Sequence, residues 1–127
     1  MLPRSSIDIP NTVGYGRAMF DKELIAATSA SITLSILSQA DSYGYEIIQR
    51  VTELSDGKLE WTEAMLYPVL HRLESRSLVE SYWQASPSGR KRKYYSVTDA
   101  GLAEIKSKKH QWRVVAGVLG TLWNDED

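Results

Sequence analysis

The densest cluster of positive charge in this sequence is a run of four consecutive cations, Arg90, Lys91, Arg92 and Lys93. They follow Ser-Pro-Ser-Gly, a run of turn-forming residues, and they precede two tyrosines. Side chains of this kind bind phosphate oxygens, and in an extended strand they alternate between its two faces. Protecting the edge of a sheet from aggregation needs only one lysine, so we interpret the four cations as a site for a polyanion.

A second set of polar side chains lies on a predicted helix that begins near Thr62. Its leucines and valine share one face, which leaves Glu63, Tyr67 and His71 on the outward face. A tyrosine or histidine there can donate to a phosphate or contact a base edge, and an ordinary solvated face is the alternative. Glu63 repels phosphate, so we expect it to cap the helix or to accept a hydrogen bond from a cytosine amino group.

The preceding predicted helix starts among aromatic residues. Asp41 and Ser42 are its predicted N-cap, and Tyr43 and Tyr45 lie on either side of Gly44. The free N–H groups of a helix N-terminus suit one phosphate. Alternatively, the rings pack between helices and the glycine permits a close approach. We expect Tyr43 to point outward and Tyr45 to be at least partly buried.

The hydrophobic periodicity predicts the elements that position these residues, in the order helix, helix, helix, hairpin, helix. Asp21 is the predicted N-cap of the first helix, and Thr98 is that of the last. Three short helices followed by a basic hairpin are typical of the winged helix-turn-helix, whose recognition helix enters the major groove of DNA. Trp61 and Trp83 lie near element junctions, and we expect both in the core.

The predicted fold class is mainly α (α+β), and the 127 residues suit one domain with appended segments. We predict an N-terminal arm over residues 1–20, a winged helix-turn-helix over 21–97, a dimerisation helix over 98–123 and an acidic tail over 124–127. The net charge of −1 hides an uneven distribution, because residues 81–113 hold eight bases and two acids. Local patches of this kind decide where a polyanion docks.

The composition excludes several other classes of function. The chain has no cysteine and only two histidines, His71 and His110, so we expect no metal site and no cofactor. It has no Gly-rich phosphate loop and no catalytic constellation, which argues against an enzyme. No apolar run suits a membrane span or a secretory signal, so we expect a cytoplasmic protein without a membrane partner.

The last predicted helix carries an apolar seam with the alternating three- and four-residue spacing of a heptad repeat. We expect it to pair two chains into a homodimer, and packing against the chain's own helices is the alternative. Facing its symmetry mate, Trp112 can line a flat slot for a planar ligand, unless it only packs in the dimer. The seam consists of Leu102, Ile105, Lys109, Trp112, Ala116, Leu119 and Trp123.

Five segments resemble, in order and spacing, the PadR-like transcriptional regulators of the short form with one C-terminal helix. They are SYGYEI at 42–47, MLYPVLHRLE at 65–74, LVESYW at 78–83, GRKRKYY at 89–95 and VTDAG at 97–101. The resemblance implies a dimeric winged-helix repressor in which Tyr67 and the wing bases contact DNA. In multidrug-responsive members, a tryptophan at the position of Trp112 stacks on flat hydrophobic ligands. Met65 and Ser77 depart from the pattern, which usually has Thr and Gly there.

We therefore predict a DNA-binding transcriptional regulator, a dimeric repressor released from a pseudo-palindromic operator by a small hydrophobic or aromatic ligand. The alternative is a protein-interaction module whose acidic segment, residues 41–80, binds a basic partner without sequence-specific DNA binding. The predicted contacts with double-stranded DNA are Tyr43, Thr62, Glu63, Tyr67, His71, Ser88, Gly89, Arg90, Lys91, Arg92 and Lys93.

Overall fold

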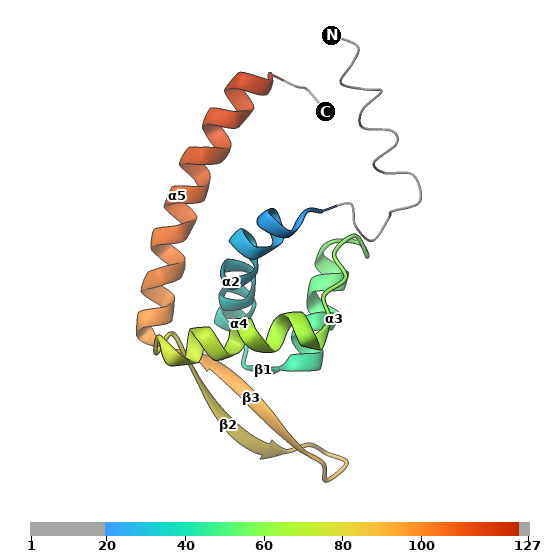
Figure 1. Ribbon diagram of the computed structural model, residues 1–127. Helices are drawn as coiled ribbons and strands as arrows, with labels where there is room; N and C mark the ends of the chain where they lie inside the picture. Colours follow the sequence, from blue (N-terminus) through green and yellow to red (C-terminus); the bar gives the residue numbers. More distant parts are fainter. Residues whose placement is uncertain (1–19, 125–127) are drawn as a thin grey trace.

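The computed structural model describes residues 20–124 and shows three packed helices, a projecting hairpin and a long final helix (Figure 1). The predicted order of helices and hairpin is confirmed, and one short strand is added before the second helix. The predicted arm and acidic tail lie outside the described residues, apart from Phe20 and Asn124. The elements are α2 (Lys22–Gln39), β1 (Ser42–Tyr43), α3 (Gly44–Leu54), α4 (Glu63–Ser75), β2 (Val79–Ala85), β3 (Lys91–Val97) and α5 (Asp99–Trp123).

The core lies where α2, α3 and α4 meet and where the sheet closes over them. Its members are fully buried aliphatic side chains with the helical spacing seen in the sequence, and Trp61 joins them as predicted. Burying this stripe holds α2 in helical form despite its many serines and threonines. The largest buried side chains are Leu34, Leu37, Ile47, Leu66, Leu70 and Leu73.

Three helices start with a side-chain cap, and two of these caps, Asp21 and Thr98, are the predicted ones. Asp21 accepts a hydrogen bond from the N–H of Leu24 at 2.8 Å. Thr62 caps α4 by accepting from the N–H of Met65, and Thr98 caps α5 in the same way. Each cap satisfies one backbone donor that the helix itself leaves free, which places these three starts at the predicted residues.

The start of α3 differs from the prediction. The helix begins at Gly44, and its N-cap residue Tyr43 makes no side-chain hydrogen bond to the first turn. Asp41 does not cap the helix, because its carboxylate accepts a hydrogen bond from the Tyr82 hydroxyl at 2.6 Å. Ser42 belongs to β1 instead. Asp41 therefore connects the α2–α3 loop to the hairpin.

The end of α4 depends on a residue in the left-handed conformation. Ser77 has a φ of 62°, at the position where the resembled family usually has glycine. Its N–H bonds to the Glu74 carbonyl, and the N–H of Leu78 bonds to the Leu73 carbonyl, both at 2.9 Å. This pair of bonds is a Schellman motif. Pro68 lies inside α4 without ending it.

The sheet is antiparallel with strand order β1-β3-β2, so β1 adds a third strand, which was not predicted, beside the predicted two-stranded wing. Tyr94 in the central strand lies opposite Tyr43 on one side and Tyr82 on the other. The next residue, Tyr95, faces the core and is buried, as strand alternation requires. We call the hairpin of β2, β3 and the turn between them the wing; it projects from the helical body in Figure 1.

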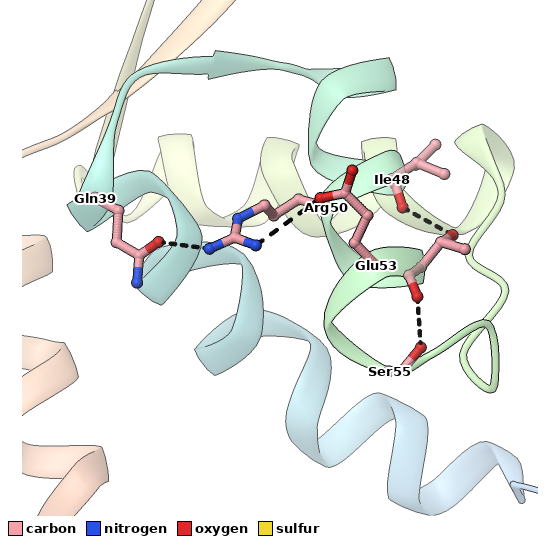
Figure 2. A network of polar contacts seen from close by, with 6 residues as sticks. Gln39, Ile48, Arg50, Glu53 and Ser55 are labelled. Atoms are coloured by element: carbon pink, nitrogen blue, oxygen red, sulfur yellow. Dashed lines mark hydrogen bonds and ion pairs between the residues drawn. The ribbon is translucent and has the colours of Figure 1, made fainter.

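A polar bridge connects the end of α2 to α3. Figure 2 shows the Arg50 guanidinium between Gln39 and Glu53, with 3.2 Å to the Gln39 amide oxygen and 3.9 Å to the Glu53 carboxylate. Both Arg50 distances involve exposed side chains, so their contribution to the free energy of unfolding is below about 1 kcal/mol. The bridge restrains the angle between two helices that the buried residues already hold together.

The last helix, α5, is 25 residues long and extends past the end of α2 (Figure 1). Its first turn is packed tightly: Gly101 is buried, and a Cβ built on it would overlap the Leu78 carbonyl oxygen. Ile105 packs against the core, and most side chains beyond it are exposed. None of the helices within residues 20–124 is long and apolar enough to cross a membrane.

Candidate nucleic-acid interface

One hollow of about 490 Å³ brings together the start of α3, the outward face of α4 and the base of the wing. We call it the wing hollow. Its lining combines four cations with three tyrosines and a tryptophan, and Glu63 is the single acid in it. A surface of this composition attracts phosphate and offers flat apolar faces to sugars and bases. The lining residues are Tyr43, Gly44, Tyr45, Glu63, Tyr67, Trp83, Arg90, Lys91, Arg92 and Lys93.

Arg92 is held in place by Tyr43. Its Nη1 donates to the Tyr43 hydroxyl at 2.8 Å, and its guanidinium carbon lies 4.4 Å from the centre of the same ring. A hydrogen bond and a cation–π contact to one side chain restrict the rotamers of the arginine. Tyr43 is therefore half-buried beneath a wing cation, and its hydroxyl is already engaged.

The Tyr43 ring continues into a row of tyrosines across the sheet. It meets Tyr94 edge to face at 5.4 Å, and Tyr94 stacks on Tyr82 at 5.7 Å. The row ends at Asp41, whose carboxylate accepts a hydrogen bond from the Tyr82 hydroxyl, and this bond raises the pKa of that tyrosine above its usual value. Arg92 is thus connected, through three rings, to the loop that precedes α3.

The other wing cations have fewer restraints. Lys93 lies on the opposite face of β3, with its Nζ 5.7 Å from the centre of the Tyr95 ring. Burial, followed by the charge of Glu74, raises the pKa of Tyr95 above its usual value. Arg90 and Lys91 are exposed, and within residues 20–124 neither forms an ion pair. Their positive charges are free to meet an external anion.

The wing turn places Ser88 and Gly89 at the tip of the hairpin. Gly89 has a φ of 89° and donates to the Ser86 carbonyl, while Ser86 donates to the Arg90 carbonyl, both at 2.8 Å. Ser88 shares a hydrogen bond with the Ser86 hydroxyl. Neither Ser88 nor Gly89 lines the wing hollow, and both lie beside its cations in sequence.

On α4, Tyr67 reaches toward the start of α3. The residue is 44% exposed, and its hydroxyl lies so close to Gly44 that a Cβ there would sit 2.6 Å from the oxygen. This confirms that Gly44 permits a close approach. His71, one turn further along α4, is also exposed but lies outside the lining of the hollow. Thr62 remains the helix cap described above.

Two residues of the hollow differ from the sequence prediction. Tyr45 is 54% exposed, contrary to the predicted partial burial, because it lies at the start of α3 and lines the open hollow instead of the core. Trp83 is 66% exposed, contrary to the predicted place in the core. Strand alternation places Trp83 on the core-facing side of β2, but it carries no information about where the core ends along the strand.

The residues of the predicted dimer seam lie along α5 in different surroundings. Ile105 packs on the chain's own core, and Leu119 is half-buried. The others are exposed, and the exposed fraction is 38% for Trp112 and 65% for Trp123. Further exposed side chains on the same helix extend its apolar surface: Val114, Val115, Val118 and Leu122.

Trp112 borders two hollows between α5 and the helical body. One, of about 420 Å³, lies between α2 and α5 and includes Ala30 and Leu34 in its wall. The other, of about 390 Å³, is lined mostly by apolar atoms and includes Ile32 and Ile36. The indole therefore forms a wall between two spaces large enough for small aromatic molecules.

Comparison with known proteins identifies the family. The model of the transcriptional regulator PadR-like family matches residues 33–107. A PadR-like transcriptional regulator from Bacillus cereus is 30% identical with a TM-score of 0.73, covering 83% of this chain and 100% of its own. A PadR family regulator from Clostridium difficile is 34% identical with a TM-score of 0.67, covering 76% of this chain and 98% of its own. An uncharacterised protein from Lysinibacillus sphaericus is 33% identical over 101 residues, which are 80% of this chain and 93% of that protein.

The match to the family model runs from the last part of α2 through α3, α4 and the sheet to the first part of α5. These matches confirm the winged-helix fold and the resemblance found in the sequence, since both the family model and the related structures cover most of the described chain. The members of this family are transcriptional regulators, which also confirms that an enzyme is the wrong class of protein. The chain therefore belongs to the PadR-like family and is a DNA-binding transcriptional regulator.

Proposed function

We propose that this regulator is a homodimeric repressor that binds operator DNA through α4 and the wing and leaves it when a planar hydrophobic ligand binds near Trp112. The observation that carries the proposal is the wing hollow, in which an exposed aromatic of α4 meets four cations of the wing. Three separate parts of the chain, the start of α3, the outward face of α4 and the wing, thus present one positively charged, aromatic surface.

In this proposal α4 enters the major groove and the wing follows the adjacent backbone. Tyr67 and His71 are exposed on the face of α4 that the core leaves free, which suits contacts to base edges. Arg90 and Lys91 supply mobile charges for phosphates, while Arg92 is positioned by Tyr43. Glu63 sits in the same hollow and disfavours phosphate at that point, so it suits a base donor such as the cytosine amino group.

The surface of α5 supports the proposed dimer. Val118, Leu122 and Trp123 are more than half exposed, and the helix extends past α2 (Figure 1). Apolar side chains concentrated on one helix are stabilised when a second copy covers them, at about 25 cal/mol per Å² of apolar surface buried. A two-fold pair would also supply a second α4, which matches the two half-sites of a pseudo-palindromic operator.

The ligand site rests on the position of Trp112. Its indole separates the two hollows beside α2, and a flat aromatic molecule can stack on such a ring while apolar side chains cover its other face. Because α5 is the proposed dimer helix, a ligand wedged beside Trp112 would change the angle between α5 and the winged core. That change would alter the spacing of the two recognition helices and weaken operator binding.

The DNA surface is tested by the salt dependence of binding. Duplex DNA from upstream of the protein's own gene is titrated by fluorescence anisotropy at several salt concentrations. Removing one cation that binds a phosphate makes the slope of log K against log salt shallower by about 0.9. We expect Lys91→Ala to lower both the affinity and the steepness of this slope, whereas Lys58→Ala, an exposed lysine beyond the end of α3, changes neither. Equal slopes for Lys91→Ala and the unaltered protein would contradict the proposed surface.

The dimer and the ligand site are tested without DNA. Light scattering should give twice the chain mass for the unaltered protein and the single mass for Val118→Asp, which introduces a charge into the apolar surface of α5. A monomeric unaltered protein at micromolar concentration would contradict the dimer. Proflavine, a planar dye, should quench tryptophan fluorescence in the unaltered protein, and Trp112→Ala should remove that quenching while keeping the dimer mass.

A further inference from the structure

Trp83 is a large aromatic side chain that does not pack in the core. It lies near the end of β2 and is 66% exposed. Along its face of the strand, burial falls from the fully covered Val79 through the half-buried Ser81 to this residue. The Ser81 hydroxyl donates to the Glu74 carboxylate at 2.6 Å, which joins this strand face to α4. Beyond it, the strand leaves the core and Trp83 faces outward.

The surroundings of Trp83 point to a ligand of opposite charge. Its partner across the sheet is Lys93, and it lines the wing hollow together with Tyr67 and all four wing cations. Within residues 20–124, no aromatic or cation–π contact involves the indole. A free apolar ring set among cations suits a partner that carries phosphates beside flat or apolar groups.

We propose that Trp83 is a DNA-contacting residue, whose indole packs on a deoxyribose of the strand whose phosphates the wing cations bind. The sugar–phosphate backbone alternates anionic and apolar groups at the spacing of neighbouring side chains, and the indole N–H can also donate to a phosphate oxygen. A basic peptide would be repelled by this surface, and a purely apolar partner would leave four cations without counter-charges. This inference rests on the proposed DNA surface of α4 and the wing.

The contribution of Trp83 differs in kind from that of the cations. Covering an apolar ring releases water but no counterions, so it adds affinity that is independent of salt. Removing a lysine makes the slope of log K against log salt shallower, whereas removing the indole leaves that slope unchanged. The two kinds of contact can therefore be separated in one set of titrations.

The experiment measures anisotropy of a labelled operator duplex at several salt concentrations for the full chain and four variants. We expect Trp83→Ala to weaken binding roughly tenfold with an unchanged slope, since about 1.4 kcal/mol of apolar burial corresponds to that factor. Trp83→Phe should retain most of the affinity because it keeps a ring. Gln84→Ala, an exposed neighbour on the other face of β2, should bind as the unaltered protein does. Lys91→Ala should make the slope shallower.

The outcomes separate this inference from the proposed function. Unchanged affinity in Trp83→Ala, with weakened binding in Lys91→Ala, overturns the DNA contact of Trp83. The exposed indole would then be assigned to contact with a protein partner. Unchanged affinity in both variants overturns the DNA surface itself. A second readout is the emission of Trp83, obtained as the difference between the unaltered protein and Trp83→Phe. DNA should change that emission, and thermal unfolding by circular dichroism confirms that each variant is folded.

Discussion

The Tyr67 hydroxyl of α4 lies against the backbone of Gly44, the first residue of α3. A Cβ at position 44 would be 2.6 Å from the hydroxyl oxygen and 3.0 Å from the ring carbon that bears it. Helices α3 and α4 form the helix-turn-helix pair. Because Gly44 has no side chain, the Tyr67 ring of α4 can lie against the start of α3. The glycine matters here through the space that it leaves and not through its conformation, because its φ is not in the left-handed region.

We expect Gly44→Ala to lower the free energy of unfolding by about 1–3 kcal/mol, the usual cost of overpacking. In a Tyr67→Phe background the cost should be smaller, because the atom nearest to the new methyl group is gone. Urea unfolding of the four proteins of this double-mutant cycle measures the coupling. Gly117→Ala is the control: no atom lies within 4 Å of its Cβ position, so it should stabilise α5 by about 0.5–1 kcal/mol. Equal costs in both backgrounds would contradict the steric explanation.

The left-handed Ser77 offers a stabilising substitution. Holding a residue with a Cβ at a φ of 62° costs about 1–2 kcal/mol of folding free energy. Glycine avoids this cost, but its more flexible unfolded chain offsets about 0.5–1 kcal/mol of the gain. We expect Ser77→Gly to raise the free energy of unfolding by about 0.5–1 kcal/mol in urea. The bond from the Thr98 hydroxyl to the Ser77 carbonyl, 2.7 Å long, is retained. Ser38→Gly, at an exposed position inside α2, should be destabilising, and a gain there too would contradict the conformational argument.

Thr33 is completely buried in α2, and its hydroxyl has no hydrogen-bond partner among the described residues. An unpaired buried hydroxyl costs about 1–3 kcal/mol, and valine has nearly the same shape without that polar group. Thr33→Val should therefore raise the free energy of unfolding by about 1 kcal/mol or more. The same change at Thr98 should lower it by about 1–2 kcal/mol, because that hydroxyl caps α5. Calorimetry of both variants measures the sign of each change in the free energy of unfolding. A destabilised Thr33→Val would show that the Thr33 hydroxyl is hydrogen-bonded in solution.

The hydrogen bond from Tyr82 to Asp41 predicts a pH dependence. The bond to the carboxylate, followed by desolvation and the negative charge of Asp41, raises the pKa of Tyr82 in the folded state above the ordinary value of about 10. The folded protein holds this proton more tightly than the unfolded chain. Its stabilising effect is therefore complete below about pH 10 and is lost as the pH rises through the folded-state pKa.

An NMR titration of tyrosine ring carbons, with Tyr82 assigned through Tyr82→Phe, measures this shift. Asp41→Asn should return the pKa of Tyr82 toward about 10. The pKa of Tyr95 is raised chiefly by burial, with the Glu74 charge second, so Asp41→Asn should leave it in place. An unshifted Tyr82 in the unaltered protein would mean that the loop before α3 is not bound to the wing in solution.

The sequence by itself determined the order of helices and hairpin, two of the four helix caps and the family. These features depend on neighbouring residues: apolar spacing along a helix, an Asp or Thr before it, and a Ser-Pro-Ser-Gly turn between strands. It also indicated Tyr67 and the four wing cations as surface residues, because one helix face or strand alternation suffices to expose them. Their roles in DNA binding remain proposals.

Only the tertiary structure decided how these residues meet. The third strand β1, the Arg92–Tyr43 bond and the Tyr82–Asp41 bond join positions 41 or more residues apart, and no local pattern reports such distances. The exposure of Trp83 could not be predicted from a local pattern either. The helices that pack on the strand cover only part of its length, and a residue beyond that part is exposed. Burial is a property of the assembled core, which is why an aromatic residue predicted to be inside is found on the surface.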